Sequence, residues 1–307
     1  MVKTIMSCPK VILTRKVPEP AMAYLQSRCE VTLWVGDQAV PRHWMLDHIA
    51  EAEGLYCLLT DPVDAEILTK ASRLKVVSTM AVGFDNIDVV ECTKRNIPVG
   101  NTPGVLTETT ADFAFGLMMT AARRIVEGAA YVENGQWHTW SPTLFLGQDL
   151  HGATLGIIGF GRIGQAVARR AAGFDMKVLV SGSSRNVQSK DKNESPMKYV
   201  DMPTLLTHSD FVTLHVPLTK ETHHLIGVRE LKLMKTTAVL VNTARGPVVD
   251  SKALYQALAR GDIAYAALDV TDPEPIPLDD PLLTLSNCLV VPHIASASVA
   301  TRNKMAM

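Results

Sequence analysis

The chain has 307 residues, 47% of them hydrophobic, and this length and composition predict about two domains with sizeable apolar cores. Its net charge is −1, from 30 basic and 31 acidic residues, so neither a nucleic acid nor a membrane surface is an expected partner. Five widely spaced cysteines without a C-x-x-C pair, and the lack of a secretory signal, favour free thiols in a reducing, cytoplasmic compartment.

Strands alternate with helices along the N-terminal third of the chain. Strands are predicted at 10–14, 31–34, 55–60, 74–79 and 97–100, and helices at 19–28, 64–71 and 86–95. Such alternation is typical of a parallel sheet with helices on both faces, so this part of the chain is predicted to be a small α/β domain.

A break at Asn101–Gly104 separates that domain from a long apolar segment. Thr107 suits a helix N-cap, and the helix predicted to follow, up to about Ile125, is apolar on nearly all sides. We therefore expect it to lie between domains or subunits. Residues 131–150 lose the helical pattern but remain apolar, so they are expected to cover either a partner subunit or their own domain.

Residues 154–170 combine a buried strand, a glycine-rich turn and an amphipathic helix. In this context Gly159 allows the tight turn, Gly161 lets the backbone approach a pyrophosphate, and Gly164 lets the helix pack on the strand. The helix start at Arg162 offers free N–H groups to an anion. The segment predicts a dinucleotide-binding domain.

The remaining chain continues the α/β pattern. Further strands are predicted at 177–181, 211–215, 238–242, 264–268 and 288–291, helices at 202–207, 229–234 and 251–259, a polar loop at 182–198 and the start of a helix at 296–307.

The strand after the glycine-rich turn ends without an acidic residue. NAD sites carry an Asp or Glu about twenty residues past the glycines, which binds the ribose 2′-OH. Here Ser183, Ser184 and Arg185 stand in that region, and hydroxyls with an arginine suit a 2′-phosphate. We predict NADPH as the preferred cofactor, with NADH as the second choice and a solvated Arg185 as the alternative.

Three reactive side chains follow predicted strands directly or closely. Arg245 can bind a carboxylate and polarise the adjacent carbonyl, and His293 can protonate that carbonyl as hydride arrives. Glu274 can orient the imidazole and favour its protonated form. Asp269 could accept from a nicotinamide carboxamide or support Arg245. Arg245, Glu274 and His293 form the set that reduction of a 2-oxo acid requires.

Some of these residues also allow simpler interpretations. His293 alone could be an ordinary rim histidine, and Glu274, between two prolines, could simply shape a turn. The adjacent pair His223 and His224 has no third ligand nearby, so no metal site is predicted.

Taken together and in this order, the motifs resemble the D-isomer-specific 2-hydroxyacid dehydrogenase family. The matching segments are MAVGFDNID (80–88), NTPG (101–104), TETTAD (107–112), GFGRIG (159–164), HVPLT (215–219), VNTARG (241–246), LDV (268–270) with EP (274–275), and PH (292–293). Within the family the chain is most similar to glyoxylate/hydroxypyruvate reductases, through the glycine-rich turn, residues 181–185 and the tryptophan-containing segment 137–146.

The resemblance implies an architecture and a reaction. Both domains would be doubly wound parallel α/β sheets, with a Rossmann cofactor domain (105–288) inserted into a flavodoxin-like substrate domain (1–104 and 289–307). The protein would be a homodimer that reduces glyoxylate or hydroxypyruvate to glycolate or D-glycerate.

It also implies roles for single residues. Arg245, Glu274 and His293 would be catalytic. Val82 and Gly83 would bind the substrate carboxylate through backbone N–H groups, and Leu106 would line its pocket. Trp140 would reach the substrate site of the neighbouring subunit. The residues expected at the cofactor are Thr110, Gly159, Gly161, Arg162, Ile163, Gly164, Ser183, Ser184, Arg185, Pro217, Thr243, Asp269 and Ala295.

The chain departs from the family pattern at two points. Ala295 stands where relatives often have glycine, and relatives continue past the position of Met307 through a helix that packs on the first domain. A catalytically impaired, dinucleotide-binding protein-interaction module is therefore the alternative function. Formate dehydrogenase is disfavoured because Glu274 stands where those relatives carry glutamine, and phosphoglycerate dehydrogenase because no regulatory domain follows.

Overall fold

The computed structural model describes residues 8–182 and 197–307. The chain divides into two compact units, one formed by Met1–Leu106 and Ala297–Met307, the other by Thr107–Ser296. Residues 289–296, which were assigned to the substrate domain from sequence, lie in the second unit. The reason is that strand β12 (Cys288–Val290) pairs with strand β11 (Tyr265–Leu268) of that unit.

The first unit is built on a five-stranded parallel sheet with the order β2-β1-β3-β4-β5. Its strands are β1 (Lys10–Leu13), β2 (Glu30–Leu33), β3 (Gly54–Cys57), β4 (Val76–Thr79) and β5 (Val99–Gly100). Its helices are α1 (Glu19–Gln26), α2 (Arg42–His48), α3 (Ala65–Lys70), α4 (Val89–Lys94) and α11 (Val299–Ala306), with a 3₁₀ turn at Ile49–Glu51.

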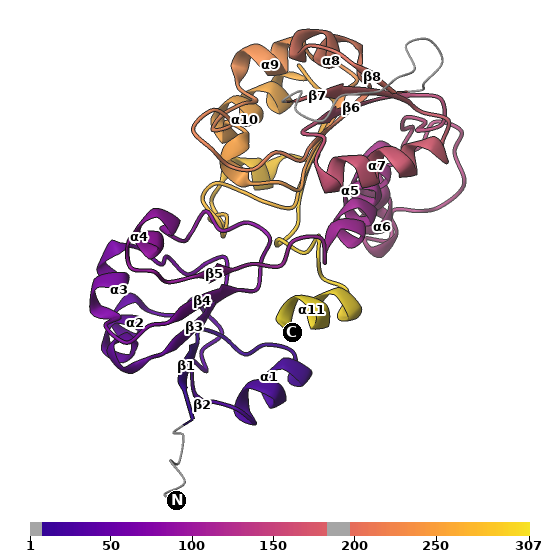
Figure 1. The fold of residues 1–307 in the computed structure, drawn as a ribbon. Coiled ribbons are helices and arrows are strands. Elements are labelled where there is room, and N and C mark those ends of the chain that lie inside the picture. The colour runs from indigo at the N-terminus through magenta and orange to yellow at the C-terminus, as the bar shows by residue number, and fades with distance from the viewer. Residues whose placement is uncertain (1–7, 183–196) are drawn as a thin grey trace, which may run out of the picture. The chain divides into compact units, whose positions relative to one another are not determined.

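Two apolar cores cover the two faces of this sheet. One core joins the sheet to α2, α3 and α4, and the other joins it to α1 and α11 (Figure 1). In the second core the Tyr56 hydroxyl donates to the Ala306 carbonyl at 2.9 Å, which ties the C-terminal helix to β3. Helix α2 was not predicted, because Met45 is its only buried residue and it shows no repeated apolar face.

The second unit is built on a seven-stranded parallel sheet with the order β12-β11-β10-β9-β6-β7-β8. The other strands are β6 (Thr154–Ile158), β7 (Lys177–Ser181), β8 (Met197–Tyr199), β9 (Phe211–Leu214) and β10 (Val239–Asn242). The helices are α5 (Thr107–Ala122), α6 (Ile125–Glu133), α7 (Arg162–Ala172), α8 (Met202–His208), α9 (Val228–Leu233) and α10 (Ser251–Arg260), with 3₁₀ turns at Gly246–Val248 and Pro281–Thr284.

Helices cover both faces of this sheet, α5 and α7 on one and α8, α9 and α10 on the other (Figure 1). The strand order runs outward in both directions from the first strand, β6. Both units are therefore doubly wound parallel α/β structures, and the predicted fold class is confirmed.

Two of the differences between predicted and observed elements have a clear structural reason. The predicted long helix ends at Ala122 rather than near Ile125, because Arg124 adopts a left-handed conformation (φ 52°). A separate helix, α6, begins at the next residue, Ile125. The buried side of α5 packs on the core of its own unit. The segment predicted as a loop at 182–198 overlaps β8, which pairs with β7.

All five cysteines carry free thiols. In the described ranges 8–182 and 197–307, no helix combines the length and apolarity that a bilayer crossing requires.

Candidate active site

The candidate site lies at the carboxyl ends of the strands of the second unit. Gly159 follows β6, His215 follows β9, Arg245 comes shortly after β10, Asp269 follows β11, and His293 comes shortly after β12. Strands β6 and β9 are neighbours from which the chain winds in opposite directions. In open α/β sheets ligands bind at this switch point.

The turn after β6 has the geometry of a phosphate-binding loop. Gly159 has φ 93°, and a Cβ there would come within 2.7 Å of the His215 carbonyl group. A Cβ on Gly164 would overlap the Gly159 carbonyl oxygen, so α7 packs closely on the turn. No side chain caps α7 at Gly161, which leaves the first N–H groups of the helix available to an anion.

His293 and Glu274 form a hydrogen-bonded pair. The imidazole Nδ1 lies 2.6 Å from Glu274 Oε1, and the two side chains are 23% and 31% exposed. The imidazole Nε2 forms no hydrogen bond within the described residues. Burial alone raises the pKa of Glu274, but the hydrogen bond and charge of His293, the Thr271 N–H and Arg245 lower this pKa below its ordinary value. Glu274 therefore remains a carboxylate at neutral pH.

Asp269 fixes the backbone that carries His293. Its carboxylate is 1% exposed and accepts from the N–H groups of Ile294 at 2.7 Å and Ala295 at 2.9 Å. The His293 N–H donates to the Asp269 carbonyl at 2.9 Å, and His293 itself has φ 52°. Burial raises the pKa of Asp269, and the two N–H groups with His293 oppose that rise without cancelling it. Sequence reasoning did not foresee this role of Asp269.

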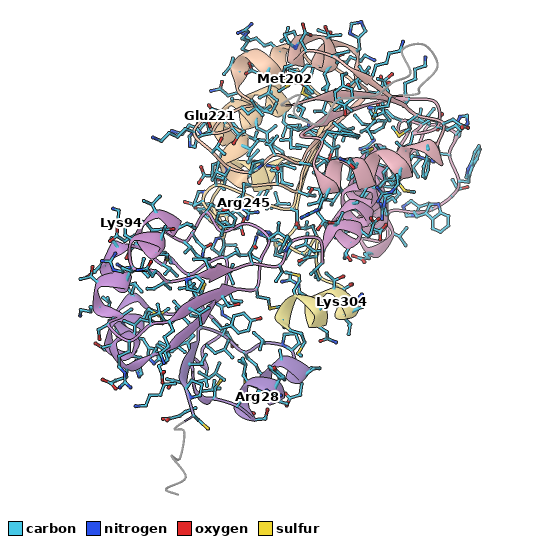
Figure 2. The ribbon with its side chains drawn as sticks, viewed as in Figure 1. Arg28, Lys94, Met202, Glu221, Arg245 and Lys304 are labelled. Atoms are coloured by element: carbon cyan, nitrogen blue, oxygen red, sulfur yellow. The ribbon has the colours of Figure 1, made fainter. Side chains whose placement is uncertain are left out.

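Arg245 projects from the loop after β10 (Figure 2). The buried Asn242 side chain holds this loop: its Nδ2 donates to the Arg245 carbonyl at 2.9 Å and its Oδ1 accepts from the Ala244 N–H at 3.0 Å. The positive charge of the guanidinium contributes to the lowered pKa of Glu274. Sequence reasoning also missed Asn242, since a strand-terminal asparagine carries no distinctive signal.

Two buried polar atoms at the same strand ends lack a partner among the described residues, Thr243 Oγ1 and His215 Nδ1. Thr213 Oγ1 and His215 Nε2 lie 3.0 Å apart, and burial lowers the pKa of His215 to about 3, so the ring is neutral at physiological pH. Together with the uncapped start of α7, these groups fit a dinucleotide, which offers phosphate oxygens and polar edges to them.

The other predicted cofactor residues have varied surroundings. Thr110 is buried in α5, Pro217 is exposed after β9, and Ala295 is buried beside Asp269. Ser183, Ser184 and Arg185 lie outside the described residues.

In the first unit, Val82 and Gly83 are half-buried in the loop after β4, and Leu106 packs partly against the core of α1 and α11. Trp140 is 77% exposed in the second unit. Across the described parts of the chain, no group of three or more His, Cys, Asp or Glu side chains is placed to hold a metal ion.

Comparison with known proteins identifies relatives over nearly the whole chain. A family model described as D-isomer specific 2-hydroxyacid dehydrogenase, NAD binding domain, matches residues 115–295. A Korarchaeum cryptofilum protein named glyoxylate reductase is 52% identical over 299 residues, which cover 97% of this chain and 90% of that protein.

Solved structures agree with this result. The TT0316 protein of Thermus thermophilus superposes with a TM-score of 0.89 at 44% identity, covering 97% of this chain and 93% of that one. An NADPH-dependent glyoxylate/hydroxypyruvate reductase of Sinorhizobium meliloti, solved with NADP and malonate, has a TM-score of 0.82 at 29% identity, with coverages of 98% and 91%.

Proposed function

The chain belongs to the D-isomer-specific 2-hydroxyacid dehydrogenase family, and from this premise we propose that it reduces small 2-oxo acids, glyoxylate and hydroxypyruvate, to the 2-hydroxy acids. The observation that carries the proposal is the Glu274–His293 hydrogen bond, held near Arg245 on a unit with a phosphate-binding turn. Relatives named glyoxylate reductase support this choice of substrate.

Each side chain has a defined part in the proposed reaction. A bound nicotinamide cofactor supplies the hydride. His293 donates a proton from Nε2 to the carbonyl oxygen of the substrate, while Glu274 keeps the ring oriented through Nδ1. Arg245 binds the carboxylate and polarises the carbonyl. Val82 and Gly83 donate backbone N–H groups to the same carboxylate.

We propose NADPH as the preferred cofactor. Strand β7 ends at Ser181, and the sequence continues with glycine, two serines and an arginine, so no carboxylate there would repel a 2′-phosphate. The NADPH dependence of the Sinorhizobium meliloti relative supports this preference. The free thiols support a reducing, cytoplasmic location.

We also propose a homodimer formed through α6 and the segment that follows it. Helix α6 has no buried residue, and a row of large apolar side chains is exposed there: Ile125, Val126, Val132, Trp137, Trp140 and Leu146. Exposed apolar patches of this kind are typical of subunit interfaces. Sedimentation of the wild type and of Val132→Glu tests this, because a charge on the patch should shift a dimer toward monomer.

Initial rates test the proposed reaction directly. Glyoxylate and hydroxypyruvate are each assayed with NADPH and NADH at equal concentration, and oxidation of the nicotinamide is followed by absorbance. Faster turnover with NADPH supports both the reaction and the cofactor preference, and faster turnover with NADH overturns the preference alone. Folded, cofactor-binding protein without turnover would instead favour the protein-interaction module, against which the intact Arg245, Glu274 and His293 set argues.

A further inference from the structure

Two backbone N–H groups in the loop after β4 form no hydrogen bond to any residue that the structure describes. Neither Val82 nor Gly83 donates a hydrogen bond within the described residues, although both residues are only half-exposed. Both lie in the loop that is proposed to bind the substrate carboxylate. Buried N–H groups are almost always paired, so two unpaired N–H groups on half-buried residues are available to water or to a bound acceptor.

The segment that follows β5 holds the carbonyl groups of the same two peptide units. The Thr102 N–H donates to the Ala81 carbonyl at 2.9 Å, and the Asn101 Nδ2 donates to the Val82 carbonyl at 2.8 Å. These two acceptors belong to consecutive peptide units, and their donors belong to consecutive residues. The loop after β4 is therefore fastened to the chain at two adjacent points.

Because a peptide unit is planar, these two hydrogen bonds also fix the directions of the Val82 and Gly83 N–H groups. In a trans peptide unit the C=O and the following N–H point in opposite directions. The bond from Thr102 to the Ala81 carbonyl thus directs the Val82 N–H, and the bond from Asn101 to the Val82 carbonyl directs the Gly83 N–H. Both N–H groups point away from Asn101 and Thr102, on one side of the loop, where one anion can accept from both.

We propose that Asn101 is a positioning residue that orients the Val82 and Gly83 amides for the substrate carboxylate. The inference rests on the proposed function, in which these amides bind that carboxylate. Donors that are already aligned bind an anion without reorganising, so the Asn101 side chain should set substrate affinity without taking part in proton or hydride transfer.

The amide of Asn101 is the group that matters. Asn101→Ala removes the donor and frees the 82–83 peptide unit to rotate. Asn101→Asp keeps the size of the side chain but presents an oxygen to the Val82 carbonyl oxygen, which repels it, and adds a negative charge near the carboxylate. Both variants should therefore weaken substrate binding, and Asn101→Asp should weaken it more.

The same loop supplies a matched control. Asn86 Nδ2 donates to the Leu58 carbonyl at 3.0 Å and to the Asp61 carbonyl at 2.8 Å, so it fastens the other end of the loop without touching the 81–83 peptide units. Asn86→Ala removes an amide of the same kind from the same loop. If Asn101 acts only through general loop stability, the two alanine variants should behave alike.

The experiment measures KM and kcat for glyoxylate, calorimetric binding of oxalate to the NADPH complex, NADPH affinity and Tm for all four proteins. We expect Asn101→Ala to raise KM and the oxalate Kd about tenfold, as loss of one hydrogen-bonding partner does, with kcat and NADPH affinity nearly unchanged. Asn86→Ala should lower Tm similarly but shift KM and the oxalate Kd far less.

The inference about Asn101 would be overturned if KM and the oxalate Kd rose equally in the two alanine variants, or if neither rose in Asn101→Ala. In either case, turnover by the wild type would still support the proposed function. If the wild type showed no turnover, the proposed function would be contradicted instead. The oxalate Kd values of the variants would still show whether Asn101 orients an anion-binding site.

Discussion

His293 Nδ1 lies 2.6 Å from Glu274 Oε1, which leaves the opposite ring nitrogen to face a substrate. This contact joins two loops that follow neighbouring strands, β12 and β11, and it gives the imidazole one orientation. Asp269, at the end of β11, holds the His293 loop from the other side through two backbone N–H groups. His293 is thus fixed at its side chain and at its backbone.

The close approach of two loops predicts that Gly246→Ala lowers activity. A Cβ at Gly246 would overlap the Thr271 carbonyl and come within 2.7 Å of the Asp272 N, so the loop that carries Glu274 must move. We expect kcat to fall by about tenfold or more, since misplacement of about 1 Å can reduce a rate about 100-fold. Steady-state kinetics and NADPH titration measure the effect.

The control for this change is Gly116→Ala on α5, where a Cβ would meet nothing within 4 Å. Its kcat should match the wild type, and its stability should be equal or slightly higher. Unchanged kcat in Gly246→Ala would show that the Glu274 loop accommodates the methyl group without consequence.

Acid stability should depend on Glu274. A carboxyl group whose pKa is lower in the folded than in the unfolded chain stabilises the fold above its unfolded pKa, and this stabilisation is lost as pH falls through the folded value. The free energy of unfolding should therefore fall less on acidification to about pH 4 in Glu274→Gln than in the wild type. Urea unfolding at a series of pH values measures this, with the exposed Glu133→Gln as the control.

His215 should produce a pH dependence of its own in the cofactor-free protein. Burial lowers its pKa from 6.5 to about 3, so between these values the unfolded chain binds a proton that the folded chain does not. The free energy of unfolding should decrease as pH falls through this window. His215→Gln removes the titrating group and should flatten the decrease, whatever its effect at neutral pH. An identical pH slope in His215→Gln and in the exposed His43→Gln would contradict the buried, neutral state of His215.

The sequence predicted most of the strands, and the places of Arg245 and His293 after strand ends, because both follow from local patterns. Buried parallel strands appear as apolar runs, and Arg245 and His293 come shortly after such runs. The glycine-rich turn was recognisable because its strand and helix flank it. Local patterns did not predict two features. One is the left-handed Arg124 that separates α5 from α6, and the other is the place of residues 289–296 in the second unit, which depends on the pairing of β12 with β11.

Roles that depend on a single long-range contact could not be predicted from the sequence either. The carboxylate of Asp269 binds N–H groups about twenty-five residues along the chain, and Asn101 binds a carbonyl nineteen residues before it. The residues adjacent to Asp269 and Asn101 in the sequence do not indicate which groups these side chains bind. The residue types were compatible with several roles, and only the fold selects among them.

The proposed role of His293 is to donate the proton in the reduction of a 2-oxo acid. It is tested most directly by comparing kcat for glyoxylate reduction with NADPH in the wild type and in His293→Ala, alongside NADPH affinity. We predict wild-type turnover, a loss of about 10² to 10⁴ in kcat in the variant, and unchanged NADPH affinity. Equal kcat in the two proteins would contradict the claim.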